Sequence, residues 1–150
     1  MQSFSQTKNI NYSAKNMFDL VMDIEKYPQF LPWCKDAKIT QHIFDDNIHA
    51  DLLINFKNIF ETYTSDIKFK ETQSDYYIHV VAIKGPFRHL VNNWHFSTIS
   101  DNSCKINFDV EFEFSSKILT KLIGVIFKEA SKKMMDAFEN RANQIYKKNV

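Results

Sequence analysis

The sequence predicts an α+β fold in which a curved antiparallel β-sheet wraps around one long C-terminal helix. Three observations lead to this prediction. Alternating apolar and polar stretches follow one another from residue 39 to residue 114 with only brief turns between them. Two short helical segments precede them, and one long amphipathic segment ends the chain. Short turns join antiparallel neighbours, and a long amphipathic helix needs an apolar surface to cover its stripe.

The N-terminal part is expected to form one strand and two short helices. Residues Ser3 to Ile10 are predicted as the first strand, although their alternation is not clean. Ser13 is a suitable N-cap for a helix over Ala14 to Asp23, where apolar residues have helical spacing. A second short helix is predicted over Ile24 to Trp33, interrupted by two prolines.

Six further strands are predicted from the alternation. They cover residues 39–43, 48–56, 59–69, 76–82, 90–99 and 105–114. The last is the clearest, because apolar residues from Ile106 to Phe114 alternate with polar or charged ones, as in a strand with one wet face. The chain has only two glycines. One of them, Gly85, precedes Pro86 and predicts a sharp loop with Phe87 at its tip.

The C-terminal segment from Ser116 to Lys148 is predicted to be one uninterrupted helix, with Ser115 and Ser116 supplying hydroxyl caps. Its apolar stripe comprises Leu119, Ile123, Ile126, Phe127, Ala130, Met134, Phe138, Ala142 and Ile145. From Ile118 to Phe127, however, apolar residues point nearly all round the axis. Either loops cover this part, or it meets a ligand, a partner or a membrane. It is too short, and too interrupted by Lys121, to span a membrane.

Composition restricts the classes of function. A chain of 150 residues is expected to form a single domain over residues 1–150, and 44% hydrophobic residues suit a globular core. The net charge of +1 gives no general nucleic-acid signature, so we expect no DNA partner. Residues Met1 to Lys8 resemble no targeting segment, so a cytoplasmic location is expected, with Cys34 and Cys104 as buried thiols rather than a disulfide.

No motif for catalysis or metal binding is found. The five histidines lack metal-ligand spacing with one another or with cysteine, and there is no glycine-rich phosphate loop or nucleophile elbow. Asp109, Glu111 and Glu113 share one strand face, but nothing there would raise one pKa to make an acid–base pair. The sequence therefore predicts no catalytic residues, no metal site and no cofactor.

The space between a curved sheet and a gripped helix is expected to form a cavity. Its predicted lining is Phe56, Tyr63, Phe108, Val110, Phe112, Ile126 and Met134, and its predicted mouth is Pro32, Trp33, Phe87, Leu90, Trp94 and Leu122. Two aromatic clusters, over residues 27–34 and 85–96, supply most of the mouth. The alternative is that these clusters are a hydrophobic plug closing the core. The sequence leaves open whether the cavity is open or filled by its own phenylalanines.

Three motifs resemble those of one family. They are Tyr27-Pro28-x-Phe30-Leu31-Pro32-Trp33-Cys34, then Gly85-Pro86-Phe87-x-x-Leu90-x-x-x-Trp94-x-Phe96, and then Cys104-x-Ile106-x-Phe108-x-x-x-Phe112-x-Phe114. The sequence resembles the coenzyme Q-binding START-like proteins of the polyketide cyclase and lipid-transport superfamily, whose bacterial members are also called ribosome-association toxins. The resemblance implies a helix-grip fold and a cavity for ubiquinone or a similar polyprenyl lipid. It also leads us to expect a basic or neutral residue where this chain has Asp66.

Three functional hypotheses follow. The first is a quinone carrier or chaperone supporting respiration, which is not an enzyme. Its quinone carbonyls would accept hydrogen bonds from the Trp33 or Trp94 indole or the Tyr63 hydroxyl. Such a carrier would dock transiently on a membrane surface. The second, from the family name and a basic strip of Lys117, Lys121, Lys128 and Lys132, is a module that binds the large ribosomal subunit and blocks subunit joining. The third is an oligoketide cyclase.

Overall fold

The computed structural model describes residues 1–147 and has the predicted α+β architecture. Its elements in chain order are β1 (Gln2–Ile10), α1 (Ala14–Met22), the 3₁₀ helix η1 (Ile24–Gln29), β2 (Cys34–Phe44), β3 (Asn47–Phe56), β4 (Ile59–Glu71), β5 (Asp75–Lys84), β6 (Phe87–Ser100), β7 (Ser103–Phe114) and α2 (Lys117–Tyr146). Every predicted strand and helix is present, with shifts at several boundaries.

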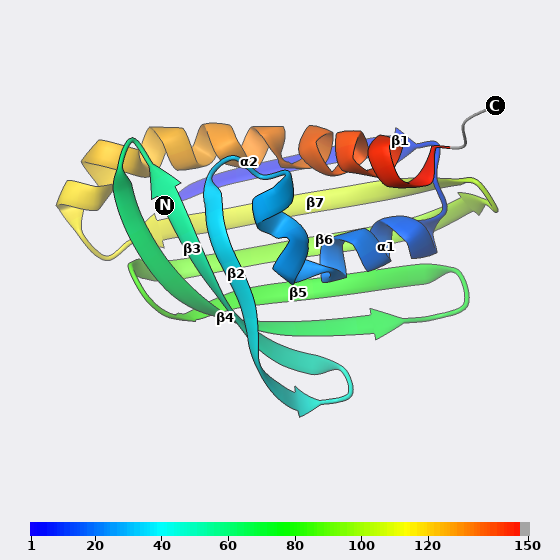
Figure 1. The fold of residues 1–150 in the computed structure, drawn as a ribbon, viewed down its shortest axis with the longest axis horizontal. Helices are drawn as coiled ribbons and strands as arrows, with labels where there is room; N and C mark the ends of the chain where they lie inside the picture. The colour runs from blue at the N-terminus through cyan, green and yellow to red at the C-terminus, as the bar shows by residue number, and fades with distance from the viewer. Residues whose placement is uncertain (148–150) are drawn as a thin grey trace.

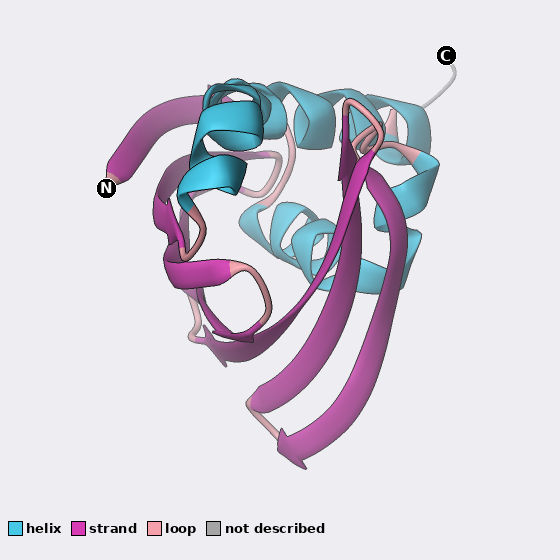
Figure 2. Cartoon of the chain, turned by 90° about the vertical axis from the view of Figure 1, so that its left-hand side faces the viewer, coloured by secondary structure: helices cyan, strands magenta, loops and turns pink. Residues whose placement is uncertain are grey.

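All seven strands belong to one antiparallel sheet in the order β1-β7-β6-β5-β4-β3-β2. Strands β2 to β7 are therefore neighbours in chain order, as short turns require, and β1 joins the far edge beside β7. Figures 1 and 2 show the sheet bent into a trough, with α2 running along it and α1 and η1 closing part of its open side. This arrangement confirms the helix-grip, START-like fold.

Ser115 and Ser116, at the junction of β7 and α2, have different roles. The Ser116 hydroxyl caps the helix by accepting a hydrogen bond from the Leu119 amide at 3.3 Å. Ser115 does not cap the helix, contrary to the prediction, because its hydroxyl donates to the Pro86 carbonyl at 2.8 Å. The junction is thereby fastened to the β5–β6 loop. Lys148, where the predicted helix ends, lies outside the described residues.

Two aromatic clusters hold α2 against the sheet. Phe127 packs on Phe112 with ring centroids 4.5 Å apart, near the beginning of the helix. Phe138 packs on Trp94 at 5.3 Å and on Tyr27 at 5.4 Å, further along it. Each such buried ring contributes about 1.5–3 kcal/mol. The predicted apolar stripe of α2 is at least half-buried except at its end, where Ile145 is 49% exposed.

The first turns of α2 are not covered by loops. Ile118, Leu122 and Val125 are 70%, 53% and 70% exposed, and their spacing places them on one face of the helix. The opposite face buries Ile123 and Phe127 in the core. Within residues 1–147, no helix combines the length and apolar character needed to cross a membrane.

The second helical segment is shorter than predicted. It is a six-residue 3₁₀ helix that contains Pro28 and ends at Gln29. The chain then turns, and β2 begins at Cys34, before the predicted start at residue 39. The sequence did not predict the early part of β2. The register of β2 against β3 shifts between Cys34 and Asp36, which breaks the regular alternation of buried and exposed side chains.

Candidate functional site

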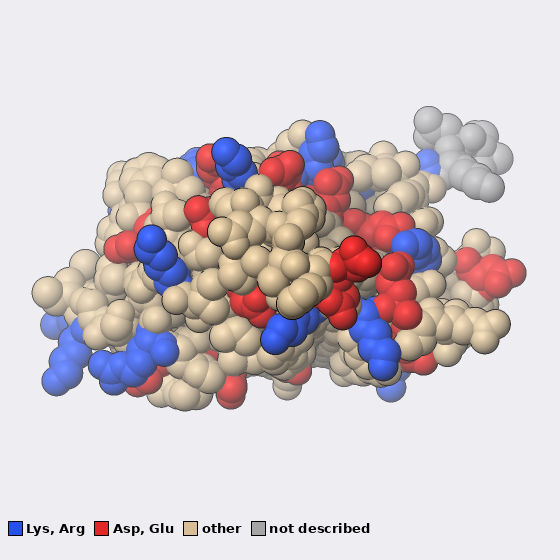
Figure 3. Space-filling model, turned by 90° about the horizontal axis from the view of Figure 1, so that it is seen from below, with Lys and Arg blue, Asp and Glu red and all other residues tan. Residues whose placement is uncertain are grey.

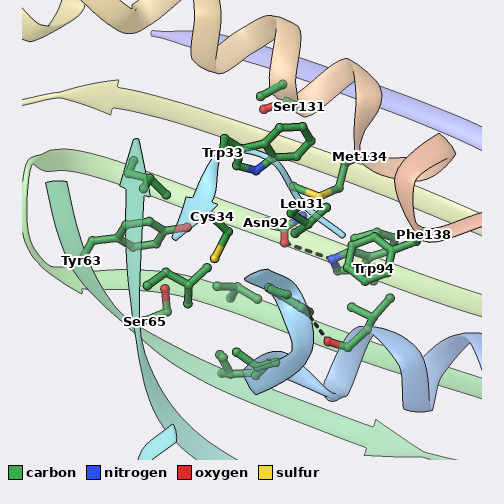
Figure 4. Close-up of a pocket in the computed structure, with 18 of the residues that line it drawn as sticks. Leu31, Trp33, Cys34, Tyr63, Ser65, Asn92, Trp94, Ser131, Met134 and Phe138 are labelled. Carbon is green, nitrogen blue, oxygen red and sulfur yellow. Dashed lines mark hydrogen bonds between the residues drawn. The ribbon is translucent and has the colours of Figure 1, made fainter. Parts of the chain in front are cut away.

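A cavity of about 100 Å³ lies between α2 and the concave face of the sheet. Strands β3 to β6 form its floor, η1 and the following turn form one wall, and α2 forms the roof (Figure 4). The roof is made by Phe127, Ala130, Ser131, Met134 and Phe138. The cavity exists because the helix presents small side chains, Ala130 and Ser131, between its two aromatic anchors.

One corner of the otherwise apolar cavity is polar. Tyr63 and Ser65 are two residues apart on β4, so their side chains leave the same face of the sheet. Figure 4 shows the Tyr63 hydroxyl pointing into the cavity toward Cys34. The Ser65 side chain is 1% exposed, and its hydroxyl has no hydrogen-bond partner among the described residues.

Other polar atoms on the wall already have partners. The Trp94 indole N–H donates to the Asn92 side-chain oxygen at 3.1 Å, so it does not serve as the free donor that we predicted. Ser131 donates to the Phe127 carbonyl at 3.0 Å, within α2. The Cys34 thiol donates to the Asp36 carbonyl at 3.4 Å. Among the described residues, Ser65 is therefore a fully buried cavity hydroxyl that the protein leaves without a partner.

The cavity carries no formal charge at neutral pH. Its described lining contains no Asp, Glu, His, Lys or Arg. Burial raises the pKa of the Cys34 thiol to about 11, and burial followed by the nearby Cys34 raises the pKa of the Tyr63 hydroxyl well above its ordinary value. Both groups stay protonated, so the corner offers neutral donors. Such a lining suits an uncharged, largely apolar ligand.

Neither cysteine forms a disulfide, and both are buried, with the pKa of Cys104 also raised by burial to about 11. In the part of the chain that the structure describes, no cluster of three His, Cys, Asp or Glu side chains is arranged to hold a metal ion.

The structure places only part of the predicted lining at the cavity. Phe56, Tyr63 and Met134 are on its wall. Phe108, Val110, Phe112 and Ile126 are not, which corrects their predicted position. The β7 residues are buried, but they lie under other side chains: Phe108 is covered by Trp94, with ring centroids 4.7 Å apart, and Phe112 by Phe127. Ile126 packs against the cluster that contains Phe112 and Phe127.

The predicted mouth residues are also divided. Trp33 and Trp94 line the cavity, but Trp94 is buried in the core rather than at a mouth. Leu90 is buried outside the cavity, and Phe87 stacks on Phe114 at 4.7 Å. Pro32 and Leu122 are exposed and away from the lining. Phe87 and Leu90 therefore belong to a hydrophobic plug that closes the core, which was the alternative that the sequence left open, and not to a cavity mouth.

Several wall residues were missed by the sequence reasoning. Ile54, Ser65, Asn92 and Ser131 all line the cavity. A signal existed for Ser65, because it follows Tyr63 by two positions in a predicted strand. No local signal marks Asn92 or Ser131, since their positions depend on how the helix sits across the sheet.

The chain is similar in sequence to known proteins. The chain is 41% identical over 148 residues to the ribosome association toxin RatA of Rickettsia prowazekii, covering 98% of this chain and 100% of that protein. It is 32% identical over 147 residues to the mitochondrial coenzyme Q-binding protein COQ10 homolog B of Xenopus laevis, covering 95% of this chain and 59% of that protein.

A solved structure supports the fold. The START superfamily protein from Mycobacterium smegmatis superposes with a TM-score of 0.77 at 19% identity, covering 95% of this chain and 98% of that one. At that identity the likeness concerns the fold alone. Residues 10–139 match the family described as polyketide cyclase / dehydrase and lipid transport. Because this match covers most of the chain, the chain belongs to the polyketide cyclase / dehydrase and lipid transport family.

Proposed function

We propose that this protein binds ubiquinone or a similar polyprenyl lipid in the cavity under α2 and acts as its carrier or chaperone, and not as an enzyme. The observation that carries this proposal is an uncharged apolar cavity with one corner of neutral donors. A quinone is an uncharged ring with carbonyl oxygens on a hydrocarbon tail, which matches that lining. The name of the Xenopus relative adds support.

The size of the cavity sets a condition on this function. A cavity of about 150 Å³ accommodates benzene, so the 100 Å³ found here is too small for a substituted quinone ring. Binding therefore requires the wall to widen. Met134 and Trp33, both partly exposed wall residues, are the side chains best able to move without uncovering the buried core. Each buried methylene of the ligand would contribute about 0.8 kcal/mol to offset this rearrangement.

A carrier of a membrane lipid also needs a docking surface. We place it at the beginning of α2, where Ile118, Leu122 and Val125 form an exposed apolar face. Arg88, Lys117 and Lys121 line a groove beside this face, together with one acidic residue, Glu113. Within residues 1–147 these three cations form no ion pair with an acidic residue.

The charge of this end suits an anionic lipid surface. Figure 3, which shows the face away from α2, has basic side chains gathered at its left-hand end, the end of the molecule where α2 begins. Apolar side chains can insert shallowly into a bilayer, and each lysine or arginine near an anionic surface adds about 1 kcal/mol. The docking surface therefore lies at the same end of α2 as the Phe127 anchor of the cavity roof.

Filling the cavity tests the lipid-binding proposal. Ala130→Leu adds apolar volume to the roof while the residue remains a good helix former. We expect the wild-type protein, purified from a quinone-producing host, to yield quinone on lipid mass spectrometry, and Ala130→Leu to yield at least tenfold less. Recovery of no quinone from wild type, together with no binding of added quinone, would sink the proposal.

A second candidate function, binding to the large ribosomal subunit to block subunit joining, is favoured by the name of the Rickettsia relative. The basic strip proposed for it lies on α2, with Lys117, Lys121 and Lys132 exposed. Lys128 is half-buried, and Lys132 pairs with Glu129 at 3.2 Å, which weakens the strip. We therefore place this function second.

Two variants separate the candidates. For ribosome binding, replacing all four lysines by glutamine should abolish co-sedimentation with ribosomes at low salt, because phosphate contacts depend on positive charge. Ala130→Leu should leave co-sedimentation unchanged. For quinone binding, Ala130→Leu should remove bound quinone from the purified protein. An oligoketide cyclase has the least support, since the described lining offers no charged acid or base.

A further inference from the structure

We propose that Ser65 and Tyr63 form a hydrogen-bonding subsite for one ligand oxygen, so that the cavity selects a ligand with a carbonyl or hydroxyl at its buried end over a pure hydrocarbon. This inference rests on the proposed ligand-binding function and adds the atoms that recognise the ligand's polar end.

Ser65 is the first observation. Its side chain is 1% exposed and belongs to the cavity wall, and its hydroxyl has no partner among the described residues. A buried hydroxyl without a partner costs stability, so such groups are uncommon in folded proteins. The residues paired with Ser65 across the sheet are Ala50 on β3 and Ala82 on β5. Their methyl groups leave room above the hydroxyl for a ligand atom.

Tyr63 is the second observation, and its position is independently fixed. Its ring packs edge-on against Phe87 with centroids 5.1 Å apart. Gly85 approaches so closely that a Cβ there would lie 2.7 Å from the Tyr63 Cβ. The ring is thus held from behind, and Figure 4 shows its hydroxyl directed into the cavity toward Cys34. The two side chains leave one face of β4 from residues about 7 Å apart along the backbone.

Two of the neighbouring donors are already engaged within the protein. The Trp94 indole donates to Asn92, and the Cys34 thiol donates to Asp36. A carbonyl oxygen accepts two hydrogen bonds through its two lone pairs, which two hydroxyls can supply. A charged ligand oxygen is disfavoured, because burial keeps the surroundings neutral and no cation lines the wall.

An ordered water molecule is the competing occupant of the corner, since water also satisfies buried hydroxyls. The two occupants make different predictions for ligand selectivity. A ligand oxygen bound by Ser65 makes the affinity of an oxygen-bearing ligand depend on Ser65. If water occupies the corner permanently, Ser65→Ala changes the affinity for oxygen-bearing and oxygen-free ligands equally or not at all.

The experiment compares two probes by isothermal titration calorimetry: ubiquinone with a decyl tail and decylbenzene, which has the same tail and no oxygen. Ser65→Ala and Tyr63→Phe should each weaken quinone binding by about five- to tenfold, the loss of roughly one hydrogen bond. Decylbenzene binding should stay within twofold of wild type. Ser131→Ala is the matched control, because that buried serine on the wall already donates to Phe127.

The outcomes separate this inference from the proposed function. If wild type binds neither probe, the proposed function fails and this inference fails with it. If wild type binds both probes, but Ser65→Ala weakens them equally or not at all, only the subsite is overturned. Infrared spectroscopy of the bound quinone gives a second readout: its carbonyl band should move to higher frequency in Ser65→Ala, because the carbonyl loses a donor. An unmoved band would also overturn the subsite.

Discussion

At the residue scale, Gly85 shows how a missing side chain positions part of the cavity wall. Its φ is +127°, a backbone conformation that residues with a Cβ rarely adopt. A Cβ there would also lie 2.8 Å from the Thr62 carbonyl oxygen. The β5–β6 loop can therefore press against β4 behind Tyr63 only because this residue is glycine.

Gly85→Ala should destabilise the protein by about 1–3 kcal/mol, because it adds backbone strain and a steric clash. Gly124→Ala is its matched control. That glycine lies within α2, and an added Cβ would contact only the Gln2 side-chain nitrogen at 3.3 Å and a Thr120 methyl at 3.8 Å. It should gain about 0.5–1 kcal/mol from helix propensity. Urea unfolding followed by circular dichroism measures both; equal effects of the two substitutions would contradict this account.

Ser65→Ala should raise the free energy of unfolding of the ligand-free protein by about 1 kcal/mol. The substitution removes a buried hydroxyl that has no partner among the described residues. Ser131→Ala, in contrast, removes an existing hydrogen bond to Phe127 and should be neutral or destabilising. Thermal unfolding of delipidated protein checks this expectation. A destabilised Ser65→Ala would indicate that the hydroxyl is already satisfied in solution.

Asp66 gives a pH-dependent contribution to stability. Burial raises the pKa of this carboxyl, but hydrogen bonds with Asn47 at 2.8 Å and His49 at 2.9 Å outweigh burial, so the pKa lies below its ordinary value of 3.8. A lowered folded-state pKa means that the stabilisation is fully present above the unfolded-state pKa and is lost as pH falls through the folded-state pKa. Asp66 thus ties β3 to β4, which accounts for an acid at this position.

Asp66→Asn should therefore lower the melting temperature near pH 6, and the difference from wild type should shrink as pH falls below about 4. The reason is that protonation removes from the wild type the same charge that the substitution removes. Melting curves at several pH values between 3 and 7 test this expectation. Asp75→Asn is a useful comparison, because hydrogen bonding to His95 lowers the pKa of that more exposed carboxyl. A pH-independent difference for Asp66→Asn would refute the linkage.

At the element scale, α2 has two different surfaces in its first turns. One buries Ile123 and Phe127 in the core, and the other leaves Ile118, Leu122 and Val125 in solvent. An exposed apolar stripe of this kind is not needed to hold the helix, since Phe127 and Phe138 already anchor it. The stripe is therefore free to contact a lipid surface.

Leu122→Asp should leave the circular dichroism spectrum unchanged and reduce flotation with anionic liposomes several-fold. The side chain is 53% exposed, so the new carboxylate remains hydrated in the folded protein while it opposes insertion. Phe87→Asp is different: Phe87 stacks on Phe114 and packs against Phe127, so the substitution should unfold the protein. A folded Leu122→Asp variant that floats as well as wild type would rule out docking through this residue.

At the scale of the whole molecule, the curved sheet and α2 surround a small cavity. A cavity of 100 Å³ is smaller than typical ligand pockets, which have about 300–1,000 Å³. The lipid binding that we propose therefore requires a wider form of the protein. That form has to be less populated than the closed one, because it exposes apolar wall to water.

The observed rate of quinone binding should therefore level off at high quinone concentration, because opening becomes rate-limiting. Stopped-flow quenching of the fluorescence of Trp33 and Trp94, which both line the cavity, measures this rate. Met134→Ala, which removes a flexible part of the roof, should raise the quinone affinity by leaving a larger cavity. A rate that increases linearly up to the solubility limit would contradict an opening step.

The sequence by itself determined most of the secondary structure and the fold class. The alternation along residues 105–114 and the helical spacing after Ser116 each predicted their element, because periodicity records which face of an element is buried. The conspicuous Gly85-Pro86 pair likewise predicted a sharp loop. These signals are local, so they can be read without knowing what each element packs against.

Only the tertiary structure decided which buried residues line a cavity. Phe108 and Ser65 both face inward from strands, yet Phe108 is covered by Trp94 whereas Ser65 lines the cavity. A pattern of alternation shows that a side chain is buried but not what lies above it. Here that depends on the position of α2 across the trough, where two aromatic anchors fix the helix and the small Ala130 and Ser131 between them leave the space unfilled.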